Sequence, residues 1–584
     1  MVQSRRQSDR SFSQKVRERL KKVIEKASYA SRYHELRLKG KHPLRLLGTP
    51  KDPWTGTVAA GAHILSGRFY CQGQILRNPD HEDGKWQAQE IWQAAHLNSN
   101  ATLNPLWQQH IHGFGWLRDL DRVVDRKAAR HRAMDLVASW LQMFDQWDEQ
   151  AWRPEVIGQR IINWMAYAPL IMDSNDLVYR SKLLNCLARQ ARHLYHVGDE
   201  ELRALPRMQV IGGLILAGLY IPYGENWLKK GTGLLNRAVS QDIFADGGVS
   251  SRNPEELYRI LRDFLMIRLS YRTMGHEIPD KLDAAIGRMT AMLKNLLQGD
   301  GRLSLFNGAS GQDAKDIAAT IALSEELYSE HPSSNGEKSG FRRLEQGSTI
   351  LIQDTGPPAD VGMSRHGHAG TLSFEMSVGK QRLIVNCGRG NALSGGVEAD
   401  LHMLSRSTAA HSTLVLNDKN SSEIREDGLI GRAPSVVNSN LTIEKGHNLL
   451  ETSHDGYLAR FGLMHHRSIY MNETGCDIRG EDILEEQGNA RKRVEGPVNF
   501  DVRFHIHPDI TLSRQGGADR LLLRLSGTEF WQFQCSGGEL SLEESLYMGA
   551  GGRRQNCRQI VISGPVIEAK TVIKWSLRRI ESRD

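Results

Sequence analysis

The sequence predicts a helical domain followed by an antiparallel β-sandwich. Apolar residues recur every three or four positions up to about residue 330, and they alternate with polar residues from residue 341 onward. The length supports this division, because 584 residues exceed a single core of ~250–300 residues and therefore require more than one domain.

Helices are expected throughout residues 85–330. In RHRAMDLVASWLQMFDQW, for example, Leu136, Trp140 and Phe144 share one helical face. Similar segments follow, and prolines stand near their expected starts or ends. Because no strict repeat is visible, we interpret this succession of helical hairpins as a curved array or an (α/α) toroid.

Strands are expected throughout residues 341–584. In TLSFEMSV, Leu372, Phe374 and Met376 alternate with polar residues. Many short runs of this kind, separated by Gly, Asn and Asp turns, predict a large antiparallel sheet folded as a sandwich. The polar segment HPSSNGEKSG, residues 331–340, is the expected linker between the two domains.

Residues 1–84 are expected to form a basic N-terminal helix and a lead-in segment. The stretch from Lys15 to Lys39 can form an amphipathic helix. We interpret it as a solvated charged face, with contact to a membrane surface as the alternative.

The composition excludes several classes of protein. Hydrophobic residues make up 40% of the chain, which excludes a disordered protein, and the net charge of +7 is spread out rather than gathered for nucleic acid. The six cysteines form no C-x-x-C pair, which argues against a thiolate zinc site. No signal peptide or transmembrane run is visible, so a cytoplasmic location is expected, with the cell envelope or periplasm as the alternative.

The segment RHGHAG offers the clearest candidate for chemistry. His366 and His368 would project to one side of an extended chain, and His411 begins another expected strand. Imidazoles from neighbouring strands can hold a metal when a carboxylate or amide supplies a third ligand. The alternative is that these histidines are hydrogen-bonded parts of the core.

The segment DGGVSSRNPEELYRI is the second candidate. Asn253 is placed to cap a helix that starts at Pro254, with Glu255 and Glu256 in its first turn. Tyr258 then lies one turn into the helix, near its loop-facing end. Simple capping with a packed tyrosine is the alternative interpretation.

A third candidate is a helical face that could line a sugar groove. Arg160, Asn163 and Trp164 are three or four residues apart and therefore share one face. The segment NPLWQQHIHGFGWL adds His110 and Trp116, again aromatic residues among polar ones. An ordinary buried tryptophan with a polar edge explains the pattern equally well.

These segments, taken in order, resemble the heparinase II/III family of polysaccharide lyases. The resemblance runs from NPLWQQHIHGFGWL through GQRIINWM, DGGVSSRNPEELY and RHGHAGTLSFEMSVGKQRLIVNCG to TAAHSTLVLND and HDGYLARFGLMHHRSIYM. It implies an incomplete (α/α) toroid and a β-sandwich that bind a sugar chain between them. It also implies cleavage of a uronic-acid polysaccharide by β-elimination.

The resemblance also assigns roles to individual residues. His366 resembles the family's catalytic histidine, and Tyr258 resembles its tyrosine, a candidate base or acid. His368 and His411 resemble two ligands of the zinc ion that some members hold. The third ligand in those members is an aspartate, and this chain has Asn386 in its place.

A second departure lies in LPRMQVIGGLILAGL. Many members have Asn-His there, whereas this chain has Pro206-Arg207. Arg207 would neutralise the substrate carboxylate by a bidentate contact, with Arg252 and Asn253 as the other candidates. An altered or inactive site is the alternative.

Three functions are therefore compared. The leading hypothesis is a lyase whose partner is an acidic polysaccharide or oligosaccharide. An α/α-toroid glycoside hydrolase would need two opposed carboxylates, for which Asp246, Glu255 and Glu256 are available. The third function is a non-catalytic glycan-binding protein. The identity of the glycan and the oligomeric state, including a homodimer, stay open.

Overall fold

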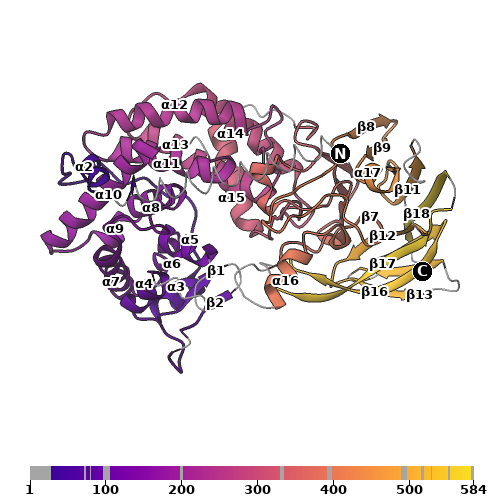
Figure 1. Cartoon of the computed structure of the whole chain (residues 1–584), viewed down its shortest axis with the longest axis horizontal. Coiled ribbons are helices and arrows are strands. Elements are labelled where there is room, and N and C mark those ends of the chain that lie inside the picture. The colour runs from indigo at the N-terminus through magenta and orange to yellow at the C-terminus, as the bar shows by residue number, and fades with distance from the viewer. Residues whose placement is uncertain are drawn as a thin grey trace, which may run out of the picture. The chain divides into compact units, whose positions relative to one another are not determined.

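The chain forms two compact units in the computed structural model (Figure 1). The structure describes residues 28–580 except 30, 72–73, 79, 97–104, 198–201, 329–333, 391–396, 488–495, 515–518, 526, 528, 550–552 and 568. The first unit, called the helical unit, comprises residues 1–202, 206–235 and 266–277. The second, called the sheet unit, comprises residues 203–205, 236–265 and 278–584.

These units do not follow the expected domain boundary at residues 331–340. Residues 236–265 and 278–328 belong to the same compact unit as the strands. Residues 334–340 of the expected linker contain turns and no helix or strand, and residues 331–333 lie outside the described part.

Helices make up the described N-terminal part of the chain, as expected. Those that lie wholly or mainly in the helical unit are α2 (Arg32–Leu38), α3 (Val58–Leu65), α4 (Ala88–His96), α5 (Pro105–Gly113), α6 (Leu117–Leu120), α7 (Arg126–Phe144), α8 (Pro154–Ala166), α9 (Ala168–Ile171), α10 (Leu177–Val197) and α11 (Ala204–Tyr220). A short hairpin of β1 (Phe69–Cys71) and β2 (Gln74–Leu76) accompanies them. Helices α12 (Glu225–Asp242) and α13 (Pro254–Thr273) contribute residues to both units, and α14 (Asp280–Asn295) and α15 (Ala314–Leu327) belong to the sheet unit.

Aromatic rings and small residues hold the helical unit together. Trp140 and Trp164 meet edge to face at 5.2 Å, and Phe114 packs on Trp164 at 5.1 Å. Helices α8 and α11 approach closely at two glycines, because a Cβ added to Gly213 would lie 2.6 Å from the Cα of Gly158. The apolar faces expected from the sequence therefore form a tightly packed core.

Two antiparallel sheets form the β-sandwich of the sheet unit. The first sheet has the order β16-β17-β12-β6-β5-β4-β3, with β7 paired to β12, and the second has the order β13-β14-β15-β18-β11-β10-β9-β8. The strands of the first sheet are β3 (Phe341–Gln346), β4 (Thr349–Asp354), β5 (Phe374–Val378), β6 (Gln381–Val385), β7 (Leu414–Leu416), β12 (Asn499–Ile506), β16 (Glu539–Tyr547) and β17 (Gln555–Pro565). Those of the second are β8 (Val437–Glu444), β9 (His447–His454), β10 (Leu463–Met471), β11 (Asp477–Glu486), β13 (Thr511–Arg514), β14 (Arg520–Arg524), β15 (Phe530–Ser536) and β18 (Lys570–Ile580).

Inward-facing residues of both sheets share one apolar core. Phe374 of β5 stacks on Trp575 of β18, with ring centroids 5.5 Å apart and planes 4° apart. In β10 and β15 the alternation of the sequence is that between this core and a more exposed outer face, whereas every residue of β5 is buried. The expected order, helices first and an antiparallel sandwich second, is confirmed.

The N-terminal expectations are only partly covered by the structure. Of the amphipathic helix expected at Lys15–Lys39, residues 15–27 lie outside the described part, and α2 occupies Arg32–Leu38. Within the described residues, every helix is too short or too polar to cross a lipid bilayer.

Candidate functional site

His366 ends the 3₁₀ helix η1 (Val361–His366) in the sheet unit. Its side chain is partly exposed, while its Nδ1 is enclosed and has no hydrogen-bond partner among the described residues. The loop before α15 packs directly against its backbone, since a Cβ added to Gly308 would lie 2.6 Å from the His366 carbonyl oxygen. Gly308 also has φ +83°, a conformation that glycine adopts readily.

Positive charges surround His366. Burial, together with Arg389, His402, Arg406 and Arg365, lowers the pKa of His366 to about 4. The imidazole is therefore uncharged at neutral pH, in a region of positive potential. We call these five residues the His366 cluster.

Two members of the cluster position the others. The Arg406 guanidinium donates to the carbonyl oxygens of Gly367 and Ser364, at 2.9 and 3.3 Å, and so holds the end of η1. His402, on α16 (Val397–Leu404), donates from Nδ1 to the carbonyl oxygen of Gly390 at 3.0 Å. That bond holds the segment that carries Arg389.

Arg389 is the functional candidate that the sequence analysis missed. It is partly exposed, and its charge acts on both His366 and Glu255. Glu255 is buried near the start of α13, where the backbone N–H and hydroxyl of Ser310 donate to its Oε2 at 3.1 and 2.7 Å. The available signal was the Gly-Arg-Gly segment, residues 388–390, in the loop that follows β6.

Glu256, the next residue, has the opposite tendency. Burial raises the pKa of its carboxyl, whereas the pKa of Glu255 is lowered, since Arg389, Arg259 and the Ser310 hydrogen bonds outweigh burial there. Its Oε2 is enclosed and has no partner among the described residues. The two carboxyls are therefore consecutive residues in one helical turn rather than a pair that faces across a cleft.

Asn253 is fully engaged in local structure. Its Oδ1 accepts from the backbone N–H groups of Glu255 and Glu256, at 2.8 and 3.2 Å, which caps α13 as expected. Its Nδ2 donates to the carbonyl oxygen of Asn307 at 3.0 Å, and Asn307 returns a bond to the carbonyl oxygen of Arg252 at 3.3 Å. Asn253 thus caps the helix in the described structure, and its role toward a substrate stays a prediction.

Arg252 is a structural arginine as well. It is 6% exposed and pairs with Asp354 at 2.5 Å. Its guanidinium also donates to four backbone carbonyl oxygens, those of Ser339, Gly340, Gly356 and Pro357. Its donors are thus used inside the protein in the described structure, and a contact of Arg252 with a substrate carboxylate stays a prediction.

Tyr258 lies within the protein. The residue is 1% exposed and its hydroxyl oxygen is enclosed by protein atoms. The Arg262 guanidinium lies 5.5 Å from the ring centroid. The structure thus gives Tyr258 the packed position that the sequence analysis held as the alternative, and does not present its hydroxyl to solvent.

The expected sugar-binding face of the helical unit is also buried. Arg160 is 0% exposed, its guanidinium lies 4.4 Å from the Trp140 ring, and it donates to the carbonyl oxygens of His112 and Ala151 at 2.9 Å each. Asn163 donates to the carbonyl oxygen of Gly113 at 2.7 Å.

The remaining candidates of the helical unit differ in exposure. Trp164 and Trp116 are 0% and 1% exposed, and Arg207 on α11 is 4% exposed. His110 is partly exposed, and its ring lies edge to face with Trp107 at 5.8 Å. Four of the residues proposed to line a sugar groove are thus buried, and their contact with a sugar stays a prediction: Arg160, Asn163, Trp164 and Trp116.

The two histidines assigned to zinc contact each other. His368 Nδ1 and His411 Nε2 are 3.0 Å apart, and His411 Nδ1 donates to the carbonyl oxygen of Ser407 at 2.7 Å. Asn386 lies close to this pair, because its Oδ1 accepts from the backbone N–H of Ser412, the residue after His411, at 3.0 Å. All three side chains are buried.

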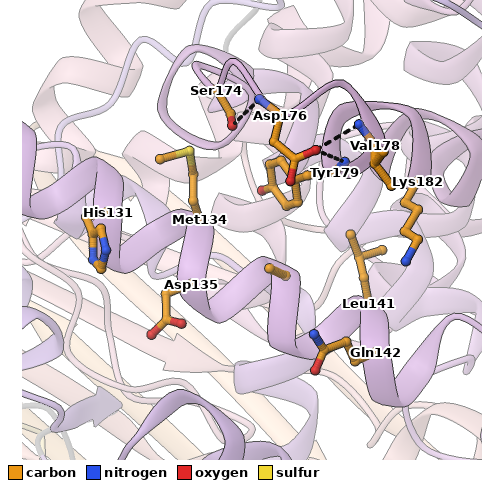
Figure 2. Close-up of a pocket in the computed structure, with 11 residues that line it drawn as sticks. His131, Met134, Asp135, Leu141, Gln142, Ser174, Asp176, Val178, Tyr179 and Lys182 are labelled. Carbon is orange, nitrogen blue, oxygen red and sulfur yellow. Dashed lines mark hydrogen bonds between the residues drawn. The ribbon is translucent and has the colours of Figure 1, made fainter.

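A separate hollow of about 400 Å³ lies in the helical unit, between α7 and α10 (Figure 2). Met134, Leu141 and Tyr179 provide apolar surface, and Asp135 and Lys182 provide charge. None of the residues predicted to be functional lines this hollow.

Comparison with known proteins identifies the fold and the family that the C-terminal part matches. Residues 329–576 match the family model described as heparinase II/III-like, C-terminal. The solved structure of heparinase III has a TM-score of 0.71 at 13% identity, over 94% of this chain and 88% of that chain. A heparan sulfate lyase mutant from Pedobacter heparinus has a TM-score of 0.60 at 16% identity, over 90% and 83%.

The C-terminal part of the chain, residues 329–576, thus matches the heparinase II/III-like family, and the chain has the heparinase III fold. Among curated proteins, it is 27% identical over 570 residues to FtsZ-localized protein C of Caulobacter vibrioides. That match covers 96% of this chain and 94% of the relative.

Proposed function

We propose that the protein is a polysaccharide lyase that cleaves an acidic, uronic-acid-containing glycan by β-elimination at the His366 cluster. The observation that carries this proposal is a partly exposed imidazole among guanidinium groups, all within one compact unit. The family match and the heparinase III fold support it.

Arg389 would bind the uronate carboxylate. The C5 proton of a uronate is very weakly acidic, so the carboxylate must be neutralised before negative charge can develop on it. A guanidinium does this with two parallel N–H···O bonds and remains charged at any relevant pH. Because Arg252 and Asn253 are used internally, Arg389 is the arginine of this unit that best fits the role.

His366 would transfer the proton. Its unprotonated nitrogen takes the proton from C5, the C5–H electron pair forms the C4=C5 double bond, and the C4–O4 bond breaks. The imidazolium formed can then return a proton to the departing O4. One side chain therefore suffices, which agrees with the enclosed position of Tyr258.

The test is a screen of uronic-acid polymers, read by the ultraviolet absorbance of the unsaturated product. Wild-type protein should give a rise in absorbance, and His366→Ala should reduce the rate by about 10²–10⁴-fold. Tyr258→Phe is the matched control, because it removes only an enclosed hydroxyl and should retain activity. A folded wild-type protein that produces no absorbance with any uronic-acid polymer would contradict the proposal.

A second candidate is a glycan-binding protein that does not cleave. It is favoured by the curated relative, whose name records localisation with FtsZ rather than a reaction. This function predicts that acidic polymers are retarded by the protein in a gel while the absorbance stays flat. A fluorescent fusion that co-localises with FtsZ would extend the relative's property to this chain.

A glycoside hydrolase has less support. Its two carboxylates must flank the scissile bond, whereas Glu255 and Glu256 are adjacent in one helical turn and Glu255 is bound by Ser310. New reducing ends without a rise in absorbance would nevertheless identify it.

A further inference from the structure

We propose that the histidine pair His368–His411 works without a metal in this protein, and that Asn386 is the residue that prevents zinc binding. In this inference a direct hydrogen bond between the two imidazoles replaces the metal as the link between their loops. The inference concerns the buried histidine pair alone and does not depend on the proposed lyase activity.

The distance between the two nitrogens fits a hydrogen bond. His368 Nδ1 and His411 Nε2 are 3.0 Å apart, which is an N–H···N distance. Zinc binds histidine nitrogens at about 2.0–2.1 Å in tetrahedral geometry, which would separate the two nitrogens by about 3.3–3.4 Å. The pair is therefore closer together than two ligands of a shared tetrahedral zinc ion.

The hydrogen-bond directions are set from the backbone. A carbonyl oxygen can only accept, so His411 Nδ1 must donate to Ser407 and its Nε2 is free to accept from His368 Nδ1. The second nitrogen of His368, Nε2, is enclosed and has no partner among the described residues. The hydrogen bonds therefore run in one direction, from His368 to His411 and from His411 to the Ser407 carbonyl oxygen.

Asn386 is a poor third ligand for zinc, because its amide carries no negative charge. One lone pair of its acceptor oxygen, Oδ1, already takes the backbone N–H of Ser412. Its other atom, Nδ2, is an N–H donor that cannot coordinate a cation, and it is enclosed without a partner in the described structure. Among the described residues no group of three or more His, Cys, Asp and Glu side chains is arranged to hold a metal ion.

The surrounding charges oppose a dication. The charged groups that act most strongly on His368 include the guanidiniums of Arg406 and Arg389. The Glu375 carboxyl accepts from the Asn386 backbone N–H at 2.9 Å, and burial raises its pKa, which favours its uncharged form. Zinc held by imidazoles and an amide would keep its full double charge in this positive region, whereas an aspartate would supply compensating charge.

The substitution Asn386→Asp is the direct test. The aspartate can keep the Ser412 bond with one oxygen and present its second oxygen where the unpartnered Nδ2 now lies. His411 is already oriented as a zinc ligand would be, with its other nitrogen bonded to a carbonyl. We therefore expect the full-length variant, incubated with Zn²⁺ and dialysed, to retain about one zinc per chain by elemental analysis.

Two further proteins complete the experiment. Wild-type protein treated identically should retain no stoichiometric zinc, and its melting temperature should not change with a chelator. The double variant Asn386→Asp, His368→Ala should lose the zinc that the single variant retains. Stoichiometric zinc in the wild type, or none in a folded Asn386→Asp protein, would overturn the inference; if that variant fails to fold, the wild-type metal content and chelator response still decide it.

Discussion

Arginine side chains of this protein have the same chemistry and very different roles, set by their partners. Arg252 and Arg160 are saturated by backbone carbonyls and a buried side chain, so they link segments of the core. Arg389 is partly exposed next to an imidazole, which makes it the residue best placed to meet an anion. A sequence pattern shows that an arginine is present, but not whether its donors are already used.

Arg389→Ala should reduce kcat/KM on a uronic-acid polymer by about 10²–10³-fold, because one charge-stabilising donor group is lost at the developing carboxylate charge. Arg389→Lys should recover only part of this loss, since a point charge replaces a bidentate fork. Initial rates from product absorbance measure both. Arg479→Ala, which removes an exposed arginine on the second sheet, is the control and should behave as wild type.

Glu256→Gln should raise thermal stability at pH 8 relative to wild type, and less so at pH 4. Burial raises the pKa of Glu256 in the folded state. The contribution of this carboxyl to the stability of the fold is therefore complete below the pKa of the unfolded state, and it is lost as the pH rises through the pKa of the folded state. Glutamine cannot ionise, so the variant does not lose stability in this way at high pH. Melting temperatures of both proteins across this pH range measure the effect, and an equal difference at both ends would contradict the assignment.

At the scale of elements, the start of α13 is joined to the strands by a buried ion pair. Arg252 has φ +55° and Asn307 has φ +49°, so two non-glycine residues adopt a left-handed backbone where the Asn307 side chain donates to the Arg252 carbonyl oxygen. Such positions persist only where surrounding contacts fix them. The Arg252–Asp354 pair and the Asn253–Asn307 bonds provide those contacts.

Arg252→Ala should therefore destabilise the sheet unit by about 3–5 kcal/mol, because the Asp354 carboxylate would be left buried and unpaired. Urea unfolding followed by far-ultraviolet circular dichroism measures the change. If Arg252 instead binds substrate, Arg252→Ala should lose activity while its free energy of unfolding stays unchanged. The two roles therefore predict opposite results.

In the helical unit, the contact of α8 with α11 depends on glycine. Gly213→Ala should weaken this unit by about 1–3 kcal/mol, because the new Cβ would meet the Gly158 backbone. Hydrogen exchange should then be faster in α8 and α11. Gly233→Ala is the control, since nothing lies within 4 Å of its added Cβ.

At the scale of the whole molecule, the sequence was sufficient for the order of the two architectures and for the family. Both rest on periodicity and on motifs that are local in the chain. The capping role of Asn253 was predictable for the same reason, since a cap is a contact between near neighbours.

The site was less predictable, because it depends on which buried groups meet across long sequence distances. The pairing of Arg252 with Asp354, and the enclosure of Tyr258 and Trp164, follow from tertiary packing alone. Arg389 was missed because it stands in a loop, where spacing carries no information about partners. Zinc binding, the glycan and a homodimer stay predictions for experiment.

The division of α13 between the two units bears on how the protein can be cut. A fragment of residues 334–584 contains nearly all of the family match, but it leaves out Arg252. The Asp354 carboxylate then loses its ion-pair partner. A fragment that begins at residue 236 retains that partner. We expect the longer fragment to be recovered in soluble, folded form and the shorter one to aggregate, so a boundary drawn from the family match alone would separate this domain from the helix that completes it.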